Sequence, residues 1–341
     1  MKKIIGFAGI LFLLAGNLFS QSLNPLFDSQ EPLEIRMKFS IKELRSETND
    51  STYLDSFLLY KSEEGSWDTV DIDLRTRGNF RKDNCYYPPL RVKIKKKHAK
   101  ETVFEGNKSL KLVLPCNRVK NADSFIAKEF LCYKLYEELS PYTFQTRMLK
   151  VTLENEDDKK GEKVELLGFF IEDDDLVAER FGGEILEDVR IIPTFMQDTA
   201  VVRHDFFQFL IGNTDWSSMY RHNEKVLKLD QSTVVPLAYD FDMTGLVNPP
   251  YAQVSNLVDI EKVTDRLYRG YCRDPEMMEF VRQEFLAKEE IVWQLVESAH
   301  SYMDEADRKA CSRFLRDFFD ILKNDLRFES MILEKCRTQS S

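Results

Sequence analysis

Short runs in which apolar and polar residues alternate dominate the first half of the chain. Residues 33–39 (LEIRMKF) alternate strictly, which is typical of a strand with one buried face. The same alternation predicts three more strands, over residues 70–75, 90–95 and 110–114. The period then changes, because the apolar residues of 124–139 fall on one broad helical stripe. This half of the chain is therefore predicted to be β-rich with one helix.

Later in the chain the pattern moves from strands to helices. The predicted elements are strands over 148–153 and 164–171, a buried helix over 199–211, short strands over 225–229 and 234–238, and three or four amphipathic helices between 275 and 336. The least regular part is 212–251, where polar loops surround the two short strands. Together these patterns predict an α+β fold with a mainly helical second half.

The first twenty residues have the order of a cleavable secretion signal. Lys2 and Lys3 precede an apolar run over residues 4–15, and Ser20 offers a small residue before a cut that would leave Gln21 first. The run is shorter than the roughly 20 residues that span a bilayer, although an uncleaved anchor helix is the alternative. No other stretch is long and apolar enough to cross a membrane. We therefore expect an exported protein, periplasmic or extracellular, without stable membrane insertion.

Charge and cysteine content narrow the possible partners. The formal net charge of −10 argues against nucleic acid as a partner, because phosphate backbones need a basic face. Residues 75–100 are nevertheless strongly basic, which suits a local anion site or a solvated surface. Six cysteines are present, none with C-x-x-C spacing, so one or two structural disulfides are possible and their pairing is open.

Candidate chemistry concentrates in 212–251. Asp215 lies in the loop after the predicted helix 199–211, Asn223 follows it, and Asp240 and Asp242 end an apolar strand. Carboxylate and amide oxygens suit Mg²⁺ or Mn²⁺, which also leave room for phosphate oxygens. The alternative is that these residues cap turns.

This segment resembles the catalytic core of CotH (spore-coat protein H) kinases, and more weakly that of HipA-type kinases. The resemblance covers about residues 33–251. It implies that Asp215 is the catalytic residue, that Asn223 and Asp240 bind magnesium, and that Asp242 is a further ligand or a hydrogen-bond anchor. It also implies a two-lobed protein-kinase-like fold, with a β-rich N-lobe over 21–172 and a helical C-lobe over 173–341. Asp215 and Asn223 are eight positions apart, whereas the common kinases place them about five apart.

Cofactor-binding residues follow from the same resemblance. The sequence Arg77-Gly78-Asn79-Phe80-Arg81 looks like a turn that covers nucleotide phosphates, and Gly78 would allow close approach of backbone N–H groups. The alternative is an ordinary hairpin turn. Lys93 is the candidate phosphate-facing lysine, and Glu129 is its candidate ion-pair partner. For these two the alternatives are a solvent-facing strand lysine and a solvated helix glutamate. Glu172 falls in the candidate segment between the lobes.

Three functions are compatible with these residues. The first is Mg-dependent phosphoryl transfer from ATP or a related nucleotide to a protein, for example one of the cell envelope, or to another hydroxyl acceptor. The second is a non-catalytic kinase-fold binding module of the envelope. The third is a metal-dependent hydrolase built on Asp240 and Asp242.

Overall fold

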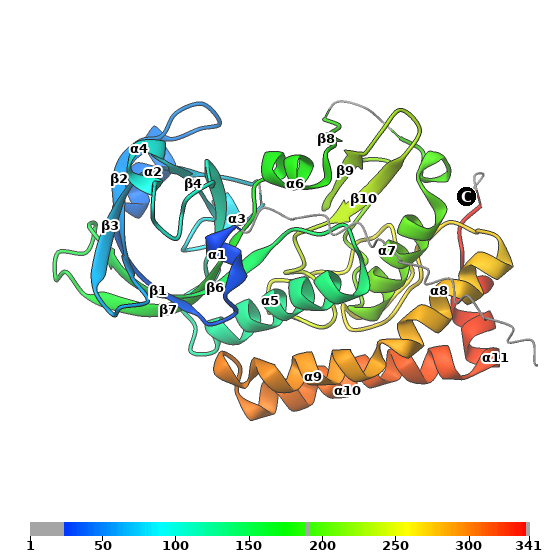
Figure 1. The fold of residues 1–341 in the computed structure, drawn as a ribbon. Helices are drawn as coiled ribbons and strands as arrows, with labels where there is room; N and C mark the ends of the chain where they lie inside the picture. Colours follow the sequence, from blue (N-terminus) through cyan, green and yellow to red (C-terminus); the bar gives the residue numbers. More distant parts are fainter. Residues whose placement is uncertain (1–23, 79, 188–190, 339–341) are drawn as a thin grey trace, which may run out of the picture.

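The computed structural model describes residues 24–338 except 79 and 188–190. The predicted signal sequence lies outside the described residues, and so does Asn79. Seven strands in the first half form a closed barrel in the order β1-β2-β3-β4-β5-β7-β6 (Figure 1). The strands are β1 (Leu33–Phe39), β2 (Leu54–Lys61), β3 (Trp67–Thr76), β4 (Leu90–Ile94), β5 (Ser109–Val113), β6 (Thr146–Asn155) and β7 (Lys163–Ile171).

Alternation along the strands fills the barrel interior. In β1 every second residue from Leu33 to Phe39 is buried, as the sequence pattern predicts. Neighbouring strands pair antiparallel except at the closure, where β1 runs parallel to β6 with Leu33 opposite Leu149. Leu26 of the first short helix joins the same hydrophobic core. The six strands predicted for this half are all present, and β2 is an additional one.

The predicted two-lobed protein-kinase-like fold is wrong. Its N-lobe would contain one helix, whereas the strands here close into a barrel and are accompanied by several helices. The closure depends on the parallel pair β1–β6, which joins segments more than a hundred residues apart and which no local pattern encodes. The helices of this half are α1 (Pro25–Asp28), α2 (Ile41–Glu47), α3 (Phe80–Asn84), α4 (Lys96–Ala99) and α5 (Ala122–Leu139).

The second half is mainly helical, as predicted. Its strands form a small antiparallel sheet in the order β10-β9-β8. The elements are α6 (Asp174–Phe181), β8 (Glu184–Ile185), α7 (Asp198–Leu210), β9 (Glu224–Lys228), β10 (Val234–Ala238), α8 (Pro275–Ala287), α9 (Glu289–Ser298), α10 (Glu305–Lys323) and α11 (Asp325–Phe328). Single turns of other helix types lie at Pro193–Phe195, Ala299–Ser301 and Glu329–Leu333.

Helix α5 joins the barrel to the helices. Figure 1 shows it crossing the middle of the molecule above α9 and α10. Its buried face shares one hydrophobic core with Phe169 of β7, Phe207 of α7 and Phe318 of α10. The loops that carry the candidate residues therefore rest on elements that are packed against the barrel.

Two disulfides cross-link the chain, within the one or two that the sequence allows. They join Cys85 to Cys116 and Cys272 to Cys336, while Cys132 and Cys311 are buried thiols. Within residues 24–338, apart from the undescribed gaps, no helix is long and apolar enough to cross a bilayer.

Candidate functional site

Asp215 lies in a loop that is anchored on the end of α7. Gly212 turns the chain out of the helix with φ +63°, a conformation that favours glycine. The buried Asn213 donates from Nδ2 to Gln208 Oε1 of α7 at 2.9 Å. Its Oδ1 accepts the backbone N–H of Asp215, also at 2.9 Å. The backbone at Asp215 is thereby held on the helix, while its side chain stays 37% exposed.

Two donors position the Asp215 carboxylate. His222 Nε2 lies 3.0 Å from Oδ1, and Asn223 Nδ2 donates to Oδ2 at 3.1 Å and to the main-chain oxygen at 2.7 Å. The hydrogen bond to Asp215 raises the pKa of His222. A bridge between Ser217 and His222 folds the intervening residues into a small hairpin. The eight-residue spacing from Asp215 to Asn223 is therefore compatible with direct contact.

Asp240 and Asp242 follow β10, which pairs with the β9 strand that begins one residue after Asn223. Asp240 has φ +63°, and its N–H donates to Tyr133 Oη of α5 at 2.9 Å. Asp242 is buried, and Tyr251 donates to its Oδ2 at 3.2 Å. Burial, and then the negative charge of Asp240, raise the pKa of Asp242 to about 7. The two carboxylates therefore lie close enough to repel each other.

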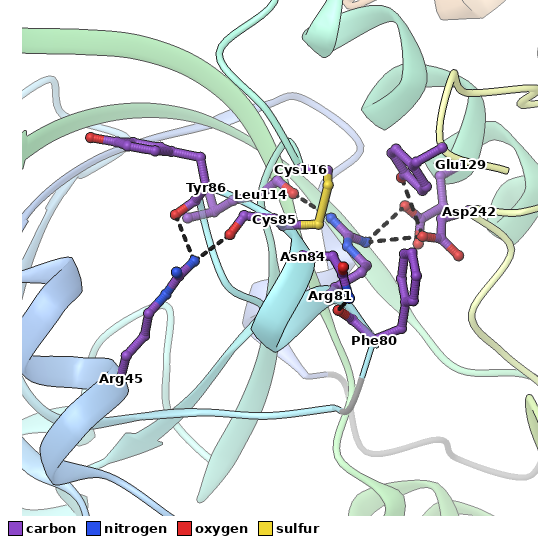
Figure 2. The surroundings of a disulfide bond; sticks show 11 residues. Arg45, Phe80, Arg81, Asn84, Cys85, Tyr86, Leu114, Cys116, Glu129 and Asp242 are labelled. Atoms are coloured by element: carbon purple, nitrogen blue, oxygen red, sulfur yellow. Dashed lines mark hydrogen bonds and ion pairs between the residues drawn. A yellow bond between two sulfur atoms is a disulfide. The ribbon is translucent and has the colours of Figure 1, made fainter.

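Arg81 approaches Asp242 from the side of the barrel. Its guanidinium is buried and donates to Leu114 O at 2.6 Å (Figure 2). One nitrogen lies 3.7 Å from Glu129 Oε2 and 3.8 Å from Asp242 Oδ2. Burial still raises the pKa of Glu129 well above its ordinary value, although the charge of Arg81 opposes this. Arg81 is thus a buried counter-ion for two carboxylates, and Glu129 pairs with Arg81 and not with the predicted Lys93.

Lys93 itself is exposed on the outer face of the barrel, where its ammonium lies 5.6 Å from the ring centre of Tyr53. The buried lysine of this region is Lys111 on β5. It forms an ion pair with Asp174 and lies 4.5 Å from the ring centre of Phe144. Our sequence reasoning missed Lys111. Its signal is a single charge inside the otherwise apolar run LKLVL at 110–114.

Positive charge surrounds Asp174 at the start of α6. Lys225 Nζ lies 3.3 Å from its second carboxylate oxygen, and Arg91 pairs with the neighbouring Asp173. Burial would raise the pKa of Asp174, but the charges of Lys111 and Lys225 outweigh it and lower the pKa to about 2. Burial lowers the pKa of Lys111 itself despite Asp174. This group of lysines and an arginine could receive an anion.

The predicted phosphate-binding turn lies near these lysines. Gly78 adopts φ +72°, and the N–H of Arg77 donates to Pro89 O at 2.9 Å. Arg77 Nε is buried without a hydrogen-bond partner. Next to the larger effect of burial, the charge of Arg77 contributes to lowering the pKa of Lys111. The structure therefore brings Arg77 and Lys111 within electrostatic reach of each other.

Glu172 lies directly after β7 and before α6, where the barrel half of the chain meets the helical half. It is buried, and both of its oxygens accept from Arg180, at 3.2 and 2.8 Å. It also accepts the backbone N–H of Gln145 at 3.0 Å. These contacts tie α6 to the start of β6, so the side chain supports the fold at the barrel edge.

A buried polar network lies beneath the Asp215 loop and was not predicted. His204 Nε2 of α7 lies 3.2 Å from Glu224 Oε2, and Ser218 donates to the same oxygen at 2.7 Å. Burial, against the opposing charge of His204, raises the pKa of Glu224 to about 7. The pair His204–Asp205 within the apolar stripe of α7 is the sequence signal for this network.

The donor set around Asp240 fits a hard divalent cation. In the part of the chain that the structure describes, no three His, Cys, Asp or Glu side chains are grouped to hold a metal by themselves. Asn223 is tied to the residue before Asp240, because its main-chain oxygen accepts the N–H of Tyr239 at 3.2 Å. Two carboxylates and an amide oxygen are the kind of incomplete oxygen set that Mg²⁺ takes when phosphate oxygens complete its shell. Burial is the main cause of the raised pKa of Asp242, and a cation beside Asp240 would relieve the repulsion from Asp240 that adds to it.

Comparison with known proteins assigns the chain to no family. No protein-family model matches the chain, and no curated protein is similar to it in sequence. The resemblance to CotH kinases therefore stays a prediction, and the function has to be inferred from the site.

Proposed function

We propose that this protein is an exported, CotH-like phosphotransferase that uses Mg²⁺ or Mn²⁺ and ATP, or a related nucleotide, to phosphorylate a hydroxyl acceptor. One observation supports this proposal: Asp215 and Asn223, in the loop after α7, and Asp240 and Asp242, in the loop after β10, lie within electrostatic reach of one another. Phosphoryl transfer asks a protein mainly for positioning and charge neutralisation, and this site offers acidic and basic groups side by side.

Asp215 is suited to act as the general base. Its carboxylate is partly exposed and is oriented by His222 and Asn223. In the proposed reaction the acceptor oxygen attacks the γ-phosphorus as its proton passes to Asp215 Oδ. The bond from the γ-phosphorus to the bridging oxygen breaks, and the nucleoside diphosphate leaves with that bond's electron pair.

Lys111 and Arg77 are the candidate phosphate contacts. Both side chains are cations near the edge of the barrel. The buried N–H at Arg77 Nε has no hydrogen-bond partner and is left to donate to a phosphate oxygen. Asp240, Asp242 and the amide oxygen of Asn223 would hold the metal ion, which supplies neutralisation of phosphate charge. The proposal rests on these contacts and not on a kinase-like fold.

The two disulfides support export, since such bonds persist mainly in oxidising compartments. A second candidate is a nucleotide-binding module without turnover. It is favoured by Arg81, which already serves as a counter-ion for Asp242 and so reduces the need for a second cation.

A thermal-unfolding panel tests nucleotide and metal binding. ATP, ADP, GTP and AMP are compared, each with Mg²⁺, Mn²⁺ or chelator. A ligand at 100 times its Kd adds about 2.7 kcal/mol to the free energy of unfolding. Asp240→Asn should abolish the metal-dependent shift, and the exposed Asp259→Asn is the matched control. If no nucleotide stabilises the wild type, the proposed function is wrong.

A further inference from the structure

The Cys85–Cys116 disulfide lies one helical turn from Arg81. Cys85 follows the last residue of α3, and its N–H donates to Arg81 O at 3.0 Å. Its partner Cys116 comes two residues after Leu114, whose oxygen accepts from the Arg81 guanidinium. The disulfide and the arginine side chain thus attach α3 to the same short segment after β5 (Figure 2).

Helix α3 depends on such attachments. It has five residues, far fewer than an isolated helix needs for stability in water. After the disulfide, Tyr86 N donates to Cys116 O at 2.7 Å, and Arg45 of α2 donates to Tyr86 O at 3.1 Å. Both contacts lie on the Cys85 side of the helix. The covalent bond is the strongest constraint on where Arg81 enters the core.

Arg81 in turn holds two other parts of the fold together. Its charge is shared between Glu129 on α5 and Asp242 in the loop after β10. Both carboxyl groups are buried, so loss or displacement of the guanidinium would leave them in the interior without the positive charge that they now face. The loop 240–251 would then lose a contact with the barrel.

We infer that the Cys85–Cys116 disulfide positions Arg81 between Glu129 and Asp242 and thereby holds the loop of Asp240 and Asp242 in place only in the oxidised protein. The structural coupling is independent of the proposed function, and its consequence for nucleotide binding rests on that function. In the oxidation, the two thiols lose two protons and two electrons to a disulfide donor, which is reduced to two thiols as the Cys85–Cys116 bond forms.

Hydrogen exchange measured by mass spectrometry tests the coupling. Cys85→Ser/Cys116→Ser should accelerate exchange of the backbone amides of 240–251 at least ~10-fold, because this loop would open locally. The matched control is Cys272→Ser/Cys336→Ser, which removes the other disulfide and should leave 240–251 unchanged. Equal protection of 240–251 in the first variant and the wild type would overturn the inference.

Arg81→Gln is the second test variant. It keeps the inference testable if the cysteine variant does not fold. With the disulfide intact, this substitution should expose 240–251 to the same extent. Combined with Cys85→Ser/Cys116→Ser, it should add little to the exchange rate of 240–251, because both changes remove the same linkage. Unchanged exchange in Arg81→Gln, or fully additive effects, would overturn the inference.

The thermal shift with ATP and Mn²⁺ is then compared among the same proteins. If the wild type shows no thermal shift, the proposed function is wrong. The hydrogen-exchange data still test the coupling between the disulfide and the loop 240–251. A wild type that shifts should lose most of that shift in Cys85→Ser/Cys116→Ser. An undiminished shift would contradict the inferred role of the disulfide in holding the loop of Asp240 and Asp242 in place.

Discussion

Replacing Asp174 by Asn should lower stability at neutral pH and remove a defined part of its pH dependence. The side chain is 15% exposed and faces Lys111 and Lys225. These charges lower its pKa from 3.8 to about 2. Since each pKa unit is worth 1.36 kcal/mol, the ionised carboxylate contributes about 2.5 kcal/mol. The folded-state pKa lies below the unfolded one, so this contribution is present above about pH 4 and is lost as the pH falls toward 2.

Urea unfolding at pH 7, 4 and 2.5 measures this contribution. Asp174→Asn should be about 2.5 kcal/mol less stable than the wild type at pH 7, and the difference should shrink between pH 4 and pH 2.5. The control is Asp175→Asn, which makes the same change at the next, exposed position. A loss below about 0.5 kcal/mol at pH 7, or a difference that does not shrink in acid, would refute the reasoning.

Three further predictions concern neighbouring features. Lys111→Met should weaken ATP binding at least tenfold in calorimetry, since a charged hydrogen bond is worth about 1.5–3 kcal/mol. The control Lys93→Met should bind ATP like the wild type, and equal effects of the two substitutions would contradict the assignment of Lys111 as a phosphate contact. Gly212→Ala should lower urea stability by about 1–3 kcal/mol, because φ is +63° and the added Cβ would lie 2.8 Å from a ring carbon of α10; an unchanged midpoint would refute this. Cys272→Ser/Cys336→Ser should cost about 4 kcal/mol, as expected for a cross-link spanning 64 residues, and a thermal midpoint like that of the wild type would exclude such a contribution.

Local patterns predicted the individual elements well, because period and burial coincide along most of them. The strand expected from the alternation of residues 33–39 and the buried helix expected over 199–211 are both present, as β1 and α7. Strand β2 was missed because residues 54–61 (LDSFLLYK) contain four apolar residues in a row, so the sequence does not alternate although the burial does. Barrel closure was missed because it depends on a pairing between β1 and β6, which are distant in sequence.

For the site, residue types were easier to predict than partners. Arg91 and Lys111 lie opposite each other in the sheet, at the end of the barrel that meets the start of α6. Lys93 lies on the same face two residues further along β4, and there it is exposed. Strand alternation identifies this face, but it cannot say which point along the strand another element covers. Arg81 of α3 was expected at a phosphate and is found between two carboxylates, because its partners come from α5 and from the loop after β10, which are distant in sequence.

In the proposed reaction, phosphoryl transfer depends on Asp215. The direct measurement is incorporation of labelled γ-phosphate from ATP with Mg²⁺ or Mn²⁺, into the protein itself and into envelope extract. Asp215→Ala should transfer at least ~100-fold more slowly than the wild type and bind nucleotide about equally well, with Asp259→Ala as the exposed control. Wild-type protein that binds nucleotide but transfers no more phosphate than Asp215→Ala would exclude catalysis by Asp215 and leave a binding module.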